Sequence, residues 1–113
     1  MMKSVLTSKI YGARVTSAEI EYEGSIKICP NLIAESGLSV YEKVLVANMD
    51  NGNRFETYVI EGELGEMGLN GAAARLGKKG DKVIIMAFSS LNSECLKNFK
   101  PKIIKVNEVN EII

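Results

Sequence analysis

Short apolar stretches recur along the chain and predict strands more often than helices. Ser25–Cys29 alternates polar and apolar residues and places Ile26 and Ile28 on one face, which is typical of a half-buried strand. Lys43–Met49 and Val83–Phe88 are nearly continuous apolar runs, as expected for buried strands. The strands predicted in this way span Lys3–Thr16, Ser25–Cys29, Lys43–Met49, Arg54–Glu61, Val83–Phe88 and Lys102–Val106.

Glycine, proline and asparagine mark the turns between these strands. Asn51 and Gly52 lie between two apolar runs, and both residue types tolerate positive φ, so they predict a hairpin that returns along Arg54–Glu61. Short helical segments are expected at Asn31–Ser36, Asn70–Leu76 and Asn92–Phe99. The first follows Pro30 and ends at Gly37. Many short strands with little helix indicate a small β-barrel.

The composition is that of one globular domain spanning residues 1–113. Apolar residues make up 46% of the chain and charged residues 25%, and 14 basic residues balance 14 acidic ones. The absence of histidine excludes Ser-His-Asp and Cys-His catalysis and every histidine metal site. Cys29 and Cys95 form no CxxC motif, so no cysteine-rich metal site is expected, and two cysteines fit a reducing compartment.

Neither a membrane nor a nucleic acid is an expected partner. Lys9 and Arg14 interrupt the N-terminal stretch before a signal-like apolar region forms, and the longest apolar run, Val83–Phe88, is far shorter than the about 20 residues of a membrane helix. Zero net charge does not supply the basic field of a nucleic-acid-binding protein. We therefore expect a cytoplasmic protein.

Three segments have residues suited to chemistry, although each also has an ordinary structural explanation. Gly24 and Ser25 are either a turn or a peptide bond that the serine hydroxyl attacks, since glycine leaves its carbonyl open. Arg54 and Tyr58 share one strand face. They are either ordinary surface residues, or Arg54 binds a substrate carboxylate through its guanidinium group and Tyr58 donates a proton. Asn70–Ala73 is either a turn or a small-residue wall with backbone N–H groups for an anion.

Each of these motifs is weak on its own, but their order and spacing along the chain are specific. They are Lys9, Tyr22–Ser25, Asn51–Tyr58, Asn70–Ala74 and Gly80–Ile85. In this order they resemble the aspartate 1-decarboxylase family of pyruvoyl-dependent enzymes, which make β-alanine. The resemblance covers nearly the whole chain.

The resemblance implies a fold and a maturation reaction. The fold is mainly β, a small six-stranded double-ψ β-barrel with short helices, and the protein is a homotetramer with active sites at subunit interfaces. The proenzyme cleaves itself into residues 1–24 and 25–113. The Ser25 hydroxyl attacks the Gly24 carbonyl and replaces the amide bond by an ester. Elimination of this ester then leaves dehydroalanine, whose hydrolysis releases ammonia and leaves a pyruvoyl group.

The resemblance also implies a role for each matching residue. The pyruvoyl group made from Ser25 forms a Schiff base with L-aspartate, so neither PLP nor a metal is expected, and Tyr58 donates the proton. The β-alanine produced supplies pantothenate synthesis. Substrate contacts are implied for Lys9, Arg54, Thr57, Gly71, Ala72 and Ala73. Asn70 is implied to support the wall of the substrate pocket. A part in processing is implied for Tyr22, Gly24 and Thr57.

Two features depart from the family pattern, and one alternative stays open. Tyr11 stands where many relatives have histidine, and the stretch Glu63–Leu69 is shorter than in some members. The alternative is a non-catalytic barrel of the double-ψ or swapped-hairpin type that serves as a binding module, because fold does not determine function.

Overall fold

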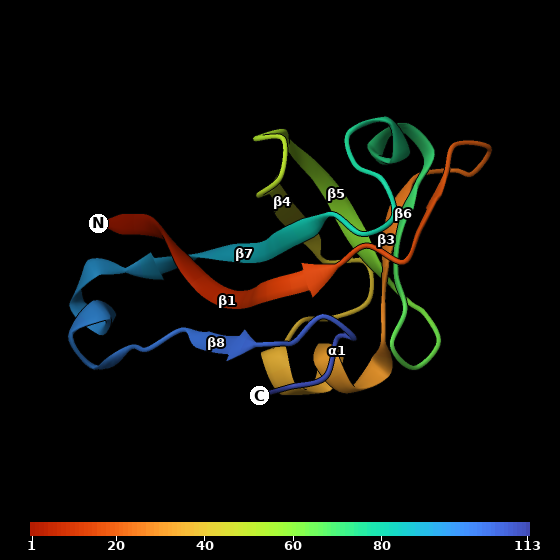
Figure 1. Cartoon of the computed structure of the whole chain (residues 1–113). Helices are drawn as coiled ribbons and strands as arrows, with labels where there is room; N and C mark the ends of the chain where they lie inside the picture. Colours follow the sequence, from red (N-terminus) through yellow and green to blue (C-terminus); the bar gives the residue numbers. More distant parts are fainter.

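Eight strands and three short helical segments make up the chain, and the computed structural model describes all of residues 1–113 (Figure 1). The strands are β1 (Met2–Arg14), β2 (Ser17–Glu19), β3 (Ser25–Ile28), β4 (Lys43–Asn48), β5 (Arg54–Glu61), β6 (Met67–Asn70), β7 (Lys82–Asn92) and β8 (Lys102–Lys105). The helical segments are α1 (Pro30–Ser36) and the 3₁₀ turns η1 (Gly71–Arg75) and η2 (Ser93–Asn98).

The sheet closes into a small barrel through a bend in its first strand. Its order is β2-β6-β3-β5-β4-β7-β1-β8, and β1 is separated from β2 only by Val15 and Thr16. β1 pairs with β7, whereas β2 pairs with β6, and the Thr16 amide donates to the Met67 carbonyl at 2.8 Å where the two ends meet. β1 and β2 therefore act as one bent strand in a ring of six, and β8 lies outside the ring.

The inner face of this ring holds the hydrophobic core. Eighteen buried apolar residues form one cluster, and the alternation predicted for β3 is confirmed because Ile26 and Ile28 are both completely buried. In β4, Val44 and Val46 point inward in the same way. Burial of each Val or Ile side chain contributes about 1.5–3 kcal/mol, so this face sets the register of the strands.

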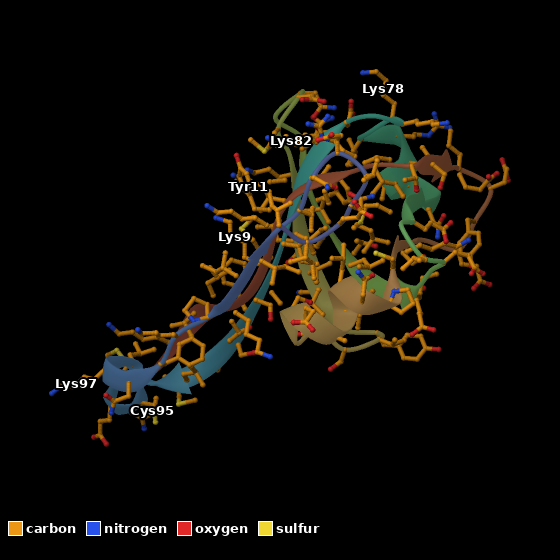
Figure 2. The ribbon with its side chains drawn as sticks, turned by 60° about the horizontal axis from the view of Figure 1, so that its bottom comes forward. Lys9, Tyr11, Lys78, Lys82, Cys95 and Lys97 are labelled. Atoms are coloured by element: carbon orange, nitrogen blue, oxygen red, sulfur yellow. The ribbon has the colours of Figure 1, made fainter.

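The outer halves of β1 and β7 continue beyond the barrel as a two-stranded arm. Met2 pairs with Asn92 at its end, and η2 follows, so that Cys95 and Lys97 lie far from the barrel (Figure 2). Two register shifts in β1, between Leu6 and Ser8 and between Tyr11 and Ala13, bend the strand along its length. None of the helical segments is long and apolar enough to cross a lipid bilayer.

The mainly β fold and its short helices are confirmed, and the differences from the predicted elements concern pairing. β2 and β6 were not predicted, because neither shows a clear hydrophobic period. β2 has only three residues, all exposed or half-buried, and β6 contains a glycine. β7 runs to Asn92, beyond the predicted end at Phe88, because its outer half pairs with β1. The hairpin at Asn51 and Gly52 is confirmed, with Gly52 at φ +78°.

A single asparagine ties the C-terminal segment to the barrel. Asn110 is buried and adopts the left-handed conformation, with φ +62°. Its side-chain oxygen accepts from the Arg14 amide at 2.7 Å, and its Nδ2 donates to the carbonyls of Arg14 and Gly65, both at 3.0 Å. Residues 14, 65 and 110 are thereby joined, although they are far apart in the sequence.

Replacing Asn110 should therefore destabilise the whole barrel. Asn110→Ala leaves one backbone donor and two acceptors without this partner and puts alanine at positive φ, so we expect the free energy of unfolding to fall by about 2–4 kcal/mol. Urea denaturation followed by circular dichroism measures the loss. Asn98→Ala is the control, since Asn98 is exposed and makes no side-chain hydrogen bond. Equal stability of the two variants would contradict the assignment.

Candidate active site

A half-enclosed hollow of about 320 Å³ lies between β5 and η1. Six of the predicted site residues contribute to it, from three different parts of the chain. They are Gly24, Thr57, Tyr58, Asn70, Ala72 and Ala73. The other lining residues, Glu23, Phe55, Glu56 and Leu76, were not predicted, although Phe55 and Glu56 lie in the same motif as Thr57 and Tyr58.

The hollow exists because one edge of β5 is only partly paired. β4 pairs with β5 from Arg54 to Tyr58, but β3 joins the other edge only from Val59 onward, opposite Ile26. Before that point the chain at Gly24 turns away from β5. The unpaired edge of β5 thus faces η1 across a gap instead of a neighbouring strand.

Ser25 occupies the first position of β3 and is completely buried. It pairs with Asn70 of β6, and the Asn70 Nδ2 donates a hydrogen bond to the Ser25 Oγ at 2.9 Å. Asn70 is also the residue before η1, where an asparagine side chain often caps the helix, but here it makes no capping bond and reaches Ser25 instead. A buried hydroxyl requires such a partner.

The backbone around Ser25 is in an unusual conformation. Gly24 has φ +100° and Ser25 has φ +156°, so two successive residues are at positive φ. Gly24 lines the hollow while Ser25 is buried next to it, so the Gly24–Ser25 bond lies at its wall. Conformations of this kind cost free energy in residues other than glycine and concentrate at functional sites.

Gly71 makes this arrangement possible, because no other residue type fits its position. It has φ +70°, and a Cβ added there would lie 2.7 Å from both the amide nitrogen and the Cα of Gly24. The same Cβ would lie 2.9 Å from the Tyr22 carbonyl oxygen. The sequence predicted Gly71 as part of the substrate wall, whereas the contacts add close backbone packing against the segment before Ser25.

The wall formed by η1 is anchored from behind by asparagine side chains. The carbonyl of Leu76 accepts hydrogen bonds from the side-chain amides of Asn48, Asn51 and Asn53, at 3.1–3.3 Å. Asn48 also donates to the buried Asp81 at 2.9 Å. This hydrogen bond, aided by Lys78 and opposed by burial, holds the pKa of the Asp81 carboxyl below its ordinary value. The hairpin before β5 and the wall of the hollow therefore form one unit.

Five of the predicted residues do not line the hollow. Ser25 and Gly71 are buried beside its wall, whereas Tyr22, Arg54 and Lys9 lie outside it. Tyr22 is 46% exposed, and its ring lies 5.5 Å below the Lys27 ammonium. Arg54 is exposed at the start of β5 and makes no ion pair. Lys9 lies on β1, far along the sheet, next to Tyr11 in Figure 2.

The strand register shows that Lys9 and Arg54 share the outer face of the sheet. Lys9 is opposite Met86, Met86 opposite Leu45 and Leu45 opposite Glu56, so three strand spacings, or about 14 Å, separate Lys9 from β5. A parallel row of opposed residues runs from Tyr11 through Ile84 and Ala47 to Arg54. Directly opposed side chains point to the same face, so both cations lie on the outer face of the sheet. Glu56 and Tyr58 share this face and line the hollow at the edge of β5.

No cation lines the hollow within one chain. Its charged lining residues are Glu23 and Glu56, and the Glu56 carboxylate is paired on the surface with Lys43 at 3.4 Å. An anionic ligand thus finds small residues, hydroxyl groups and backbone at this wall but no positive charge. Two strand positions beside the hollow have cations: Lys43, opposite Tyr58 on β4 and paired with Glu56, and Arg54, two residues before Glu56.

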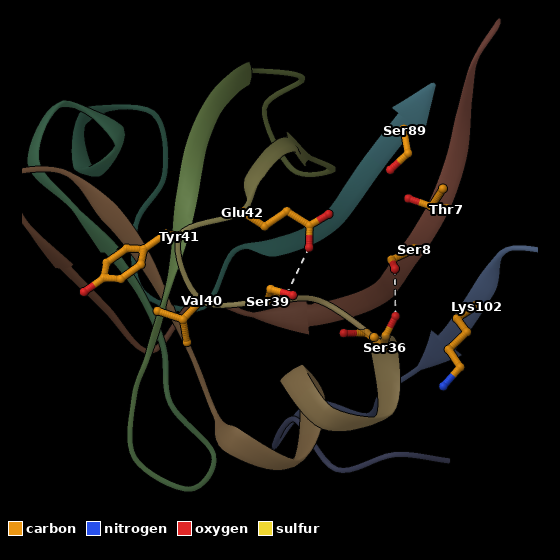
Figure 3. Close-up of a pocket in the computed structure, with 10 residues that line it drawn as sticks. Thr7, Ser8, Ser36, Ser39, Val40, Tyr41, Glu42, Ser89 and Lys102 are labelled. Carbon is orange, nitrogen blue, oxygen red and sulfur yellow. Dashed lines mark hydrogen bonds between the residues drawn. The ribbon is translucent and has the colours of Figure 1, made fainter. Parts of the chain in front are cut away.

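A larger hollow of about 610 Å³ lies elsewhere, between α1, β1 and β8 (Figure 3). Its hydroxyl groups hold the fold together: Ser8 donates to the Ser36 carbonyl at 2.7 Å, and Thr7 donates to the Ala87 carbonyl at 3.1 Å. None of the predicted site residues lines it. A choice of candidate site by volume alone would therefore select a hollow without any of the predicted residues.

A small β-barrel with a buried serine after a left-handed glycine, beside a hollow lined by threonine and tyrosine, fits an enzyme that acts on a small molecule. The chain matches the family described as Aspartate decarboxylase over residues 1–113. It is similar to the aspartate 1-decarboxylases of Bdellovibrio bacteriovorus (49% identity over 96% of this chain and 88% of the relative) and Campylobacter jejuni (53% over 95% and 86%). That of Psychromonas ingrahamii is 44% identical over 100% and 91%. The chain belongs to the aspartate decarboxylase family, as the motifs predicted.

The contact between Gly71 and Gly24 can be tested by adding a single methyl group. Gly71→Ala combines positive φ with a backbone clash, so we expect the free energy of unfolding to fall by about 3 kcal/mol or more. Gly80→Ala is the matched control: Gly80 has φ +95°, but nothing lies within 4 Å of an added Cβ. It should lose only about 1–2 kcal/mol. Equal losses in urea denaturation would show that Gly71 is required only for its φ.

Proposed function

We propose that this chain is a pyruvoyl-dependent aspartate 1-decarboxylase that cleaves its own backbone between Gly24 and Ser25. The mature enzyme converts L-aspartate to β-alanine and CO₂ and so supplies β-alanine for pantothenate synthesis. The observation that carries the proposal is the buried Ser25 hydroxyl, which the Asn70 amide holds directly after a left-handed glycine at the wall of the hollow. Membership of the family supports the same reaction.

The local geometry favours Ser25 as the nucleophile of the cleavage. The Asn70 amide donates to Oγ, which leaves the hydroxyl proton free to be lost as the oxygen attacks the Gly24 carbonyl carbon. Gly24 has no side chain to cover that carbonyl. Thr57 lies across the hollow from this bond and is the proposed assisting hydroxyl.

The residues around position 25 fit a carbonyl group made from the serine. Asn70 would hold it through the side-chain amide that now binds Oγ, and Gly71 leaves room for the backbone beside it. A pyruvoyl group supplies a ketone that condenses with the substrate amine and accepts the electron pair left when CO₂ departs. Ala72 and Ala73 form a wall of the hollow without bulky side chains.

Tyr58 is the proposed proton donor for the carbon that loses CO₂. It lines the hollow opposite η1 and is 37% exposed, so its hydroxyl is accessible to a bound substrate. A tyrosine hydroxyl gives up its proton only to a strong base at neutral pH, and the carbon left by decarboxylation is such a base. No histidine competes for this role, since the chain has none.

The carboxylates of aspartate require cations that one copy of the hollow lacks. Lys9 and Arg54 lie on the outer face of the sheet, on either side of the half-buried apolar residues Leu45, Ile84 and Met86. We infer that this face covers the hollow of a second copy, so that Lys9 and Arg54 bind the substrate across the interface. A homotetramer with shared active sites is the proposed assembly.

The first test is the Ser25→Ala variant. Without the hydroxyl, the chain should run as one full-length band on a denaturing gel, whereas the wild type separates into two fragments. CO₂ release from labelled L-aspartate should fall by at least about 10³-fold, to background, because the electron sink is absent. Turnover by the uncleaved variant would contradict the proposed cofactor.

The second test asks whether the site is shared between copies. Lys9→Ala and Ser25→Ala should each be nearly inactive, but co-expressed chains should recover about a quarter of the wild-type activity, because one interface in four combines the two intact halves. Ser25→Ala with Tyr58→Phe is the control pair. Both residues belong to the same hollow, so this mixture should recover nothing. Recovery by both pairs, or by neither, would contradict a shared site.

A further inference from the structure

Tyr41 has a backbone conformation that large side chains rarely adopt. It lies between α1 and β4 with φ +73°, in the left-handed region where glycine and asparagine are common and a bulky residue is an outlier. Its side chain adds nothing to the core, because Tyr41 is 76% exposed. Neither burial nor local preference therefore accounts for tyrosine at this position.

Backbone hydrogen bonds fix this conformation next to β5. The Tyr41 amide donates to the Val59 carbonyl at 2.7 Å, and the Val59 amide donates to the Glu42 carbonyl at 3.1 Å. The Glu42 carboxylate in turn accepts from the Ser39 amide at 2.9 Å. The segment thus continues the pairing of β4 and β5 beyond Lys43 and Tyr58, and it places Tyr41 beside Tyr58.

The two tyrosine rings form an aromatic pair. Their centroids are 6.3 Å apart and the rings are tilted by 43°, within the range of favourable edge-to-face and tilted contacts. Tyr41 also lines the larger hollow, at the side of it away from Ser8 and Thr7, as Figure 3 shows. Tyr58 has no other aromatic partner, and it also lines the site hollow.

We propose that Tyr41 is a positioning residue for Tyr58. Its ring packs against the Tyr58 ring and restricts its rotation, so that the phenol stays at the wall of the site hollow. The left-handed backbone aims the Tyr41 ring at Tyr58, and the strain is retained for that reason. This inference rests on the proposed function in so far as Tyr58 donates the catalytic proton.

The test separates stability from proton delivery with two substitutions. Tyr41→Asn removes the ring but suits positive φ, so the Tm should stay equal or rise by about 1–4 °C, while kcat for aspartate falls about tenfold and KM changes less than about twofold. Tyr41→Phe keeps the ring and should keep kcat within about twofold. Val40→Ala is the control for disturbance of the same exposed loop and should leave kcat and Tm unchanged.

A second readout does not depend on turnover. The chain has four tyrosines, so ¹³C-labelled tyrosine gives four ring signals, and the Tyr58 signal should shift in Tyr41→Asn but not in Tyr41→Phe. If the wild type released no CO₂, the proposed function would fail, while this signal would still decide whether Tyr41 positions Tyr58. An unchanged Tyr58 signal in Tyr41→Asn would overturn the inference, as would a drop in Tm that accompanies the loss of kcat.

Discussion

The hydrogen bond from the Asn70 amide to the buried Ser25 hydroxyl is the contact on which the site depends. It fixes the end of β6 against the start of β3, because a hydroxyl without a partner would be costly at a completely buried position. The next residue, Gly71, then brings its backbone against Gly24 at a distance that excludes any side chain. The unusual backbone at Gly24 and Ser25 is held by these contacts.

The barrel divides the predicted site into two parts, and this division explains the proposed assembly. One part is the hollow between β5 and η1, which has Tyr58 and a wall of small residues beside the buried Ser25 but no cation in its lining. The other part is the region of the outer sheet face beyond the hollow, which has Lys9 and Arg54. The proposed site combines the two parts between copies, because the two carboxylates of aspartate would then meet the cations that the hollow lacks.

Local signals in the sequence were sufficient for some elements and not for others. The hairpin at Asn51 and Gly52 and the helix that ends at Gly37 were predicted correctly, because φ preferences act within a few residues. β2 and β6 were missed, because these segments become strands only by pairing with distant parts of the chain. Their close packing shows this dependence, since a Cβ on Gly68 of β6 would lie 2.9 Å from the Ser17 Oγ of β2. The closure of the barrel depends on such distant contacts.

The same difference between local and long-range information applies to the candidate site. Motif order indicated the residues around the hollow, but the separation of Lys9 from Tyr58 follows from strand register and could not be seen in spacing along the chain. The anchoring of Leu76 by three asparagines depends on the hairpin folding back on η1, and the pair of Tyr41 with Tyr58 depends on an uncommon φ.

The intact mass of the purified protein tests the central claim most directly. If Ser25 breaks the backbone, the spectrum contains residues 1–24 and residues 25–113, and the larger fragment is lighter by one ammonia than the same fragment beginning with serine. A single full-length mass in protein that decarboxylates aspartate, or an unmodified serine at the start of the larger fragment, would contradict the account.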